Sequence, residues 1–313
     1  MLGRTACGLY WMFRQLERSE NTARLVEAGF RMALTRSVSA SSEWDSVMTT
    51  AGCRDAYLDS HARFETDTAI DFLMRSKDNP ASVLTLFANA RQNARQVRTA
   101  LTREVWEAVN EGWMTLRDAL ARPVRIAELP GLISTVRQQS ALVRGMLYGT
   151  MLQDDIFNYA RLGTFIERAD NTARILDVKY YVLLPATSYV GSSLDNVQWE
   201  TVLRSASADR SYHWLHGGDS KPSEIADFLI LDRRMPRSLY YCCCEVVDNL
   251  AALARLYDVR KPSHDMAEEA QARLNRTTID EIFEAGLHEF IADFLVRNNA
   301  LGSQIETDYR FYE

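Results

Sequence analysis

Apolar residues recur every three or four positions along most of this chain, the spacing that places them on one face of an α-helix. No segment shows the alternation of apolar and polar residues that is typical of a half-buried strand. Glycine and proline are few, at 14 and 7 residues, and they gather at the breaks between periodic segments. The pattern predicts helices over residues 4–36, 43–51, 56–76, 80–120, 131–150, 154–184, 195–206, 222–233, 237–259 and 266–300.

The predicted helices follow one another without a low-complexity linker. Residues 121–131 are expected to form a short loop rather than a hinge between domains. Asn79-Pro80 indicates a helix start, with Asn as the cap and Pro at the first helical position. We therefore expect one all-α domain over residues 1–313, folded as a single compact helical bundle.

The sequence repeats itself. Residues 17–27 read ERSENTARLVE and residues 167–177 read ERADNTARILD, with six identities in the first eight positions. Two further pairs of matching positions, which we also call echoes of the repeat, follow in the same order in both parts of the chain. They are Trp44 with Trp199 and Pro80 with Pro222. Three ordered echoes predict two duplicated halves, about residues 1–125 and 126–313, which pack about a pseudo-twofold axis.

On a helical wheel, each copy of the repeated motif forms a polar column that borders the main apolar face. The columns consist of Glu17, Asn21 and Arg24 in the first copy and Glu167, Asn171 and Arg174 in the second. Arg18 and Arg168 point about 100° away from the columns, toward a different neighbour. A column at the edge of the core is not a solvated helix face, so it needs another explanation.

Two interpretations of the columns stay open. In the first, they form a half-buried ion network that fixes how the two motif helices pack, because a buried charge needs a partner. In the second, they line one cleft that binds a ligand or performs catalysis, with Glu17 and Glu167 as acid–base or amine-binding groups. The ligand-binding residues of this cleft would then also include Arg18, Asn21, Arg168 and Asn171. The sequence leaves it undecided whether the protein is an enzyme.

A row of arginines supports the interpretation that the two polar columns line one cleft. It consists of Arg91, Arg95 and Arg98 on one helix face, with Arg233 and Arg237 in the second half. The simplest interpretation is a basic ridge that faces solvent. In the ligand interpretation, Arg91, Arg95 and Arg237 join Arg24 and Arg174 in binding a carboxylate or phosphate through paired hydrogen bonds.

Composition narrows the classes of partner. A formal net charge of −6 disfavours nucleic acid, because binding to phosphates needs a basic excess. No run approaches the roughly 18 apolar residues of a membrane span, and charges interrupt the apolar start, so we expect no membrane helix and no signal peptide. The five cysteines lack Cys-x-x-Cys spacing and no phosphate loop occurs, so we expect reduced thiols, no metal, no cofactor and a cytoplasmic location.

Several short motifs together carry a family resemblance. They are Leu9-Tyr10-Trp11-Met12, Glu17-Arg18, Asn21-Thr22-Ala23-Arg24, Asn79-Pro80, Ala90-Arg91, Asn93-Ala94-Arg95, Arg98 and the run from Glu167 to Arg174. In combination they resemble the bacterial alpha-E domain family over essentially the whole chain. Cys7 and Phe13 depart from the family pattern, which has a polar and a small residue at these positions.

The resemblance implies a helical protein whose function is uncharacterised. Members of the family are typically encoded beside a circularly permuted ATP-grasp protein, and often beside a transglutaminase-like peptidase. These neighbouring genes imply ATP-dependent formation of amide or peptide bonds, in which the ATP-grasp partner activates a carboxylate. The chain would then be an accessory subunit or would handle a peptide or amino-acid substrate. The alternative is a non-catalytic scaffold whose motifs are packing networks.

Overall fold

The computed structural model describes residues 3–35, 40–183, 193–217 and 221–312. Across these residues the chain forms helices and turns and no strand, so the predicted all-α fold is confirmed. The elements are α1 (Gly3–Thr35), α2 (Ala40–Ala51), α3 (Arg54–Leu58), α4 (Thr66–Arg75), α5 (Val83–Gln96), η1 (Arg98–Ala100), α6 (Arg103–Ala119), η2 (Ile126–Glu128), α7 (Leu129–Thr150), α8 (Asp155–Leu183), α9 (Ser193–Ser205), α10 (Asp209–His216), α11 (Pro222–Ile230), α12 (Leu239–Tyr257), α13 (Pro262–Arg276), α14 (Ile279–Ala285) and α15 (Leu287–Asp308).

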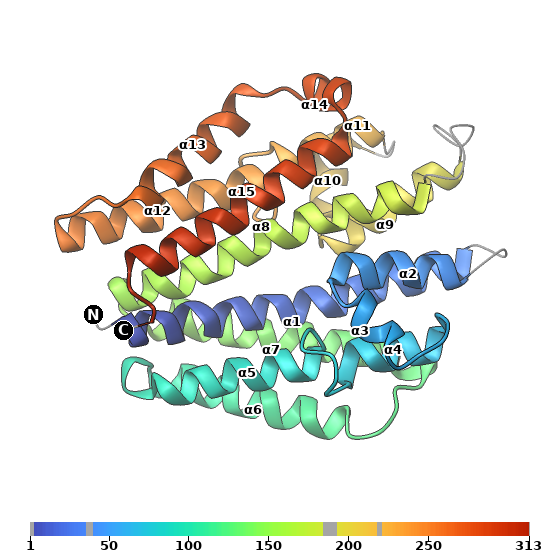
Figure 1. Ribbon diagram of the computed structural model, residues 1–313, viewed down its shortest axis with the longest axis horizontal. Helices are drawn as coiled ribbons and strands as arrows, with labels where there is room; N and C mark the ends of the chain where they lie inside the picture. The colour runs from blue at the N-terminus through green and yellow to red at the C-terminus, as the bar shows by residue number, and fades with distance from the viewer. Residues whose placement is uncertain (1–2, 36–39, 184–192, 218–220, 313) are drawn as a thin grey trace.

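The two helices that carry the repeated motif, α1 and α8, lie side by side in the middle of the molecule (Figure 1). Helices α5, α6 and α7 lie beyond α1, and α12, α13 and α15 lie beyond α8. The backbones of α1 and α8 approach closely at Gly163, where a β-carbon would lie 2.2 Å from the carbonyl oxygen of Tyr10. Only glycine permits this contact, which brings the two motifs within reach of each other.

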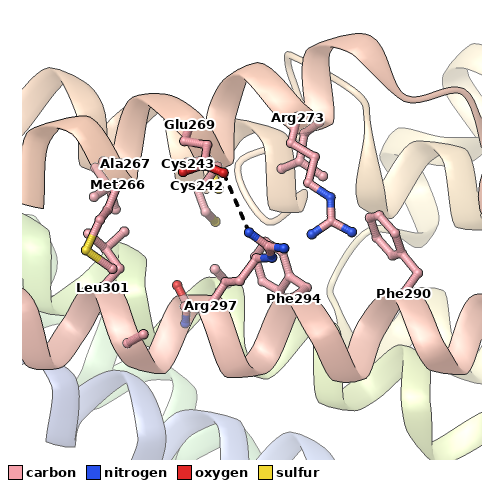
Figure 2. Close-up of a pocket in the computed structure, with 16 residues that line it drawn as sticks. Cys242, Cys243, Met266, Ala267, Glu269, Arg273, Phe290, Phe294, Arg297 and Leu301 are labelled. Carbon is pink, nitrogen blue, oxygen red and sulfur yellow. Dashed lines mark ion pairs between the residues drawn. The ribbon is translucent and has the colours of Figure 1, made fainter.

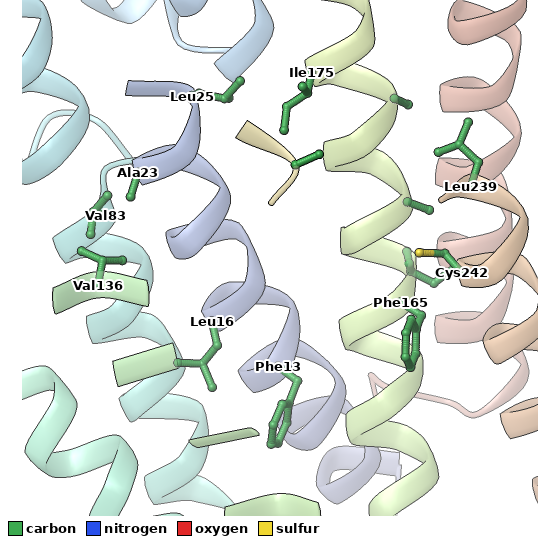
Figure 3. Close-up of a cluster of buried hydrophobic side chains, with 14 of the residues drawn as sticks. Phe13, Leu16, Ala23, Leu25, Val83, Val136, Phe165, Ile175, Leu239 and Cys242 are labelled. Atoms are coloured by element: carbon green, nitrogen blue, oxygen red, sulfur yellow. The ribbon is translucent and has the colours of Figure 1, made fainter. Parts of the chain in front are cut away.

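One hydrophobic cluster runs through both groups of helices. Phe13 of α1 and Phe165 of α8 are buried in it, together with Val83 of α5 and Leu239 of α12 (Figure 3). The apolar stripes that the sequence pattern predicts therefore meet in a common core rather than in two separate ones.

Three of the long helices that the pattern predicts are divided in the structure. The segment 80–120 forms α5 and α6, with Thr102 capping α6. The segment 56–76 forms α3 and α4, and the segment 266–300 forms α13, α14 and α15, with a left-handed Gly286 before α15. The apolar spacing continues across each turn because successive helices bury similar stripes against the same core, so periodicity alone does not reveal these breaks.

The predicted helix start at Asn79-Pro80 is wrong by three residues. Helix α5 begins at Val83, and the Oγ of Ser82 caps it by accepting a backbone N–H of the first turn at 3.3 Å. Asn79 forms the preceding turn instead, where its Oδ1 accepts the backbone N–H of Ala81 at 2.9 Å. Asparagine favours both caps and turns, so the residue type did not distinguish the two.

The structure also changes the register of the third sequence echo. Pro236 precedes Ser238, the cap of α12, as Pro80 precedes Ser82. Both serines donate to a backbone carbonyl six residues earlier, at 2.5 and 2.8 Å. Pro222 instead opens α11. The local contacts of Pro80 therefore resemble those of Pro236 rather than those of Pro222, because proline opens many helices and is a weak marker of register.

Candidate functional site

The glutamate of each motif binds the arginine of the other motif. Arg18 donates to both carboxylate oxygens of Glu167, at 2.5 and 2.9 Å. Arg168 donates in the same way to Glu17, at 3.0 and 3.1 Å. The expectation that Arg18 and Arg168 point toward other neighbours is therefore wrong. Helices α1 and α8 lie close enough for each arginine, which leaves the flank of its own helix, to reach the facing glutamate.

Glu17 lies at the centre of a buried ion cluster. Besides Arg168, it accepts hydrogen bonds from Arg237 at 3.1 Å and from Arg144 at 3.2 Å. Arg237 and Arg144 also reach Glu20, at 3.1 and 2.7 Å. Arg24 completes this Glu17 cluster by pairing with Glu20. Glu17 is only 1% exposed.

Burial alone would raise the pKa of Glu17, but the guanidinium groups of Arg168, Arg237 and Arg144 outweigh it and hold the pKa well below its usual range. Burial likewise opposes ionisation of Glu167, yet its arginine partners lower the pKa. A carboxylate held so firmly in its ionised form is a weak proton acceptor near neutral pH. These two groups are therefore better suited to holding arginines than to acid–base chemistry.

A second ion cluster surrounds Glu167. Arg14 donates to Glu167 at 3.1 Å, beside Arg18. Asp170 accepts from Arg174 at 2.5 Å, in the position that Glu20 and Arg24 hold in the first motif. Arg18, Arg174, Arg14, Glu167 and Asp170 form this Glu167 cluster. Its difference from the first is exposure, because 37% of the Arg18 side chain and 34% of the Arg174 side chain remain accessible.

A cavity of about 430 Å³ opens beside the Glu167 cluster. Its walls come from α1, α8, the turn between α2 and α3, and the start of α5. Residues of both motifs line it, namely Arg18, Asn21, Thr22, Glu167, Asp170, Asn171 and Arg174. We call it the motif cavity. Its volume is within the range of small-molecule sites in proteins.

Buried polar atoms in the wall of the motif cavity have no protein partner. Neither amide atom of Asn21 is hydrogen-bonded within the described part of the chain, and the Nδ2 of Asn171 is also unpaired. The same holds for Oε1 of Gln15 and Oγ1 of Thr50, which also line the cavity. Asn21 and Asn171 are 4% and 3% exposed. Unpaired buried polar groups are costly to a fold, so their concentration in one cavity indicates a binding site for a polar ligand.

The structure divides the predicted site residues into three places. The motif cavity is lined by Arg18, Asn21, Glu167, Asn171 and Arg174. The Glu17 cluster holds Glu17, Arg24, Arg168 and Arg237. Arg91 and Arg95 lie on α5 outside the residues that line the cavity, where Arg91 donates to Asn110 at 2.7 Å and stacks over Trp113.

Two arginines of the clusters, Arg14 and Arg144, are not predicted from the sequence. Arg14 sits among Tyr10 and Phe13 on the buried side of α1, and an arginine within an apolar stripe is a signal that could have revealed it. Arg144 belongs to α7, distant in sequence from both motifs, and nothing in its own surroundings distinguishes it from a surface arginine.

A second cavity, of about 120 Å³, lies between α12, α13 and α15 (Figure 2). Phe290, Phe294 and the buried Cys242 line it, and Arg297 pairs with Glu269 at its edge at 3.7 Å. Burial raises the pKa of the Cys242 thiol to about 12. The apolar walls and the protonated thiol suit packing rather than chemistry.

Two other features of the described residues bear on function. Those residues contain no group of three His, Cys, Asp or Glu side chains placed to hold a metal ion. Nor do they include a helix with the length and apolar character needed to cross a lipid bilayer.

A Glu-Arg pair lies at the centre of each cluster. The model of the Alpha-E family, described as a predicted alpha-helical domain with a conserved ER motif, matches residues 1–309. The chain belongs to the Alpha-E family. The dipeptide Glu-Arg occurs in this sequence at Glu17-Arg18 and Glu167-Arg168 alone. The glutamate of each dipeptide accepts hydrogen bonds from the arginine of the other, between α1 and α8. No curated protein and no solved structure shows significant similarity to the chain.

Proposed function

We propose that this Alpha-E protein is a substrate-handling partner of an ATP-grasp amide or peptide ligase and that it binds a peptide or amino-acid ligand in the motif cavity. The observation that carries the proposal is the set of unpaired amide groups of Asn21 and Asn171 beside the accessible arginines Arg18 and Arg174. Amide groups match the donors and acceptors of a peptide bond, and arginine matches a carboxylate.

In this proposal the two clusters have different roles. The Glu17 cluster is a packing network, because Glu17 is enclosed by three arginines and does not line the cavity. The Glu167 cluster forms one wall of the binding site, where Glu167 holds Arg18 in position. The scaffold interpretation thus applies to one cluster and the ligand interpretation to the other.

The ATP-grasp protein supplies the chemistry in this proposal. Its part is to activate a carboxylate with ATP, while the Alpha-E chain presents the substrate that is joined to it. The family resemblance suggests this partner, and in this proposal the chain is a bacterial cytoplasmic protein. The net charge of −6 disfavours nucleic acid as the ligand.

We also infer that the chain is one domain formed from two related halves, about residues 1–125 and 126–313, around a pseudo-twofold axis between α1 and α8. The reciprocal Glu-Arg pairs and the matching serine caps of α5 and α12 support this inference. The shared hydrophobic cluster supports a single domain.

The test is to purify the neighbouring ATP-grasp protein with this chain and to measure ATP-dependent amide formation. Asn21→Leu is the informative variant, because the Asn21 amide has no protein partner to lose and leucine has a similar volume. We expect Asn21→Leu to keep the complex and reduce amide formation at least about tenfold, the loss expected for a polar ligand left unpaired.

The control is Asn299→Leu, at an exposed position of α15 far from the motifs in sequence. It is expected to leave amide formation unchanged. Equal activity of Asn21→Leu and wild type would show that the motif cavity does not handle the substrate. Absence of any complex would refute the partnership itself.

A further inference from the structure

Two positions in the chain hold the same place relative to the two motifs. Thr22 of the first motif donates to the carbonyl oxygen of Ala81 at 3.1 Å. Thr172 of the second motif donates to the carbonyl oxygen of Arg237 at 2.8 Å. Each of these positions directly precedes the serine cap of the following helix, α5 or α12. Ala81 and Arg237 are therefore structural counterparts with different side chains.

The guanidinium group of Arg237 bridges two carboxylates. Its Nη1 donates to Glu17 and its Nη2 to Glu20, both at 3.1 Å. The counterparts of these acids in the second motif are Glu167 and Asp170, which line the motif cavity. Ala81 lines the same cavity and has only a methyl group there. Where Arg237 fills the space in one half, the counterpart space in the other half is part of an open cavity.

The charges of the two clusters differ by one cation. In the described part of the chain, the acids Glu17 and Glu20 are held by Arg24, Arg144, Arg168 and Arg237. The acids Glu167 and Asp170 are held by Arg14, Arg18 and Arg174. One bound cation would give both clusters two acids and four cations. The Glu17 cluster demonstrates that this fold accommodates that ratio.

We propose that the motif cavity binds a guanidinium group of its ligand, which bridges Glu167 and Asp170 as Arg237 bridges Glu17 and Glu20. The ligand class is an arginine or an arginine-containing peptide. A planar guanidinium with its fork of N–H groups suits two neighbouring carboxylates better than a compact ammonium does. The unpaired amides of Asn21 and Asn171 then bind the rest of the ligand. This inference rests on the proposed ligand-binding function and specifies its substrate.

The first experiment measures binding of L-arginine and of L-citrulline, its neutral counterpart of nearly equal shape, by isothermal titration calorimetry. We expect arginine to bind the full-length protein at least about tenfold more tightly than citrulline, because a buried carboxylate pair discriminates by charge. In Ala81→Arg, the new side chain should occupy the cavity and abolish binding of arginine. It should also raise the thermal midpoint above that of Ala81→Met, which fills the cavity without a charge.

The second experiment uses the other half of the molecule as an internal reference. Arg237→Ala opens the counterpart space and leaves Glu17 and Glu20 with fewer partners, so its thermal midpoint should fall. Methylguanidinium should raise the midpoint of Arg237→Ala more than that of wild type, and neutral methylurea should not. This rescue would show that the geometry accepts a free guanidinium.

The outcomes separate this inference from the proposed function. Equal affinity for arginine and citrulline, both lost in Ala81→Arg, would overturn the guanidinium inference and support a ligand site of other specificity. Failure of both amino acids to bind wild type, despite rescue of Arg237→Ala, would also overturn the inference. The Asn21→Leu assay with the ATP-grasp protein then decides the proposed function independently.

Discussion

Replacement of Glu17 by glutamine tests whether the Glu17 cluster holds the two central helices together. The Glu17 carboxylate accepts four hydrogen bonds, two of them from Arg168 and the others from Arg144 and Arg237. Glutamine keeps the shape but removes the charge, and its NH2 group then faces a guanidinium donor. Glu20 remains as the acid nearest to Arg144 and Arg237.

The size of the effect follows from burial. Glu17 is 1% exposed, so water cannot replace the lost interaction for the arginines. Removal of one partner from a buried ion pair typically costs about 3–5 kcal/mol of unfolding free energy. We expect Glu17→Gln to lie in this range. Glu167→Gln should cost less, about 1–3 kcal/mol, because its partner Arg18 is 37% exposed and water can replace part of the lost interaction, although Glu167 itself is only 2% exposed.

The assay is urea unfolding followed by far-ultraviolet circular dichroism and by tryptophan fluorescence, since coincident transitions are needed before a free energy is assigned. Glu27→Gln is the matched control. Glu27 lies on the same helix and pairs with Arg31 at the surface, so its loss should cost at most about 0.5 kcal/mol. A cost below about 1 kcal/mol for Glu17→Gln would refute the packing role of the cluster.

Three further predictions concern acid, packing and thiol reactivity. The folded pKa values of Glu17 and Glu167 lie below the ordinary value of 4.5, so the stability that these carboxylates contribute is complete above that pH and is lost as the pH falls below it. The thermal midpoint, measured as a function of pH, should therefore decline in acid. A constant midpoint would contradict this prediction. Gly163→Ala should destabilise the protein by about 1–3 kcal/mol or more, because the added carbon meets the α1 backbone. Gly145→Ala has open space around the added carbon and should lose nothing, so equal urea midpoints of the two variants would be the contrary result. The buried Cys242 thiol, with its pKa raised to about 12, should react with Ellman's reagent only at the rate of unfolding, and fast labelling of Cys242 in the folded protein, located by peptide mapping, would disprove this.

The sequence pattern predicted the central helices closely because helical periodicity is a local property. The predicted segments 4–36 and 154–184 begin within one residue of α1 (Gly3–Thr35) and α8 (Asp155–Leu183), and their predicted last residues, 36 and 184, lie outside the described residues. The repeat also singled out the acids of both ion clusters, but it did not reveal Arg14 and Arg144, which lie outside the motifs. It failed at helix ends such as Asn79, where a turn and a cap use the same residue types.

The wheel gave the direction of each side chain relative to its own helix, but it could not locate the neighbouring helix. Arg18 and Arg168 were therefore assigned to other neighbours, although each binds the glutamate of the facing motif. The close approach at Gly163 makes this possible, and no local pattern reveals which backbone lies there.

By itself, the sequence determined that this protein is helical, that two similar motifs lie on buried helix faces, and that their charges need partners. Only the tertiary structure decided which partners they have and where space is left. Arg237 comes from 220 residues away to enclose Glu17, while its counterpart Ala81 leaves Glu167 beside a cavity. The reason is physical, since helix formation depends on neighbours a few residues apart, whereas a cavity depends on the size of side chains brought together by long-range packing.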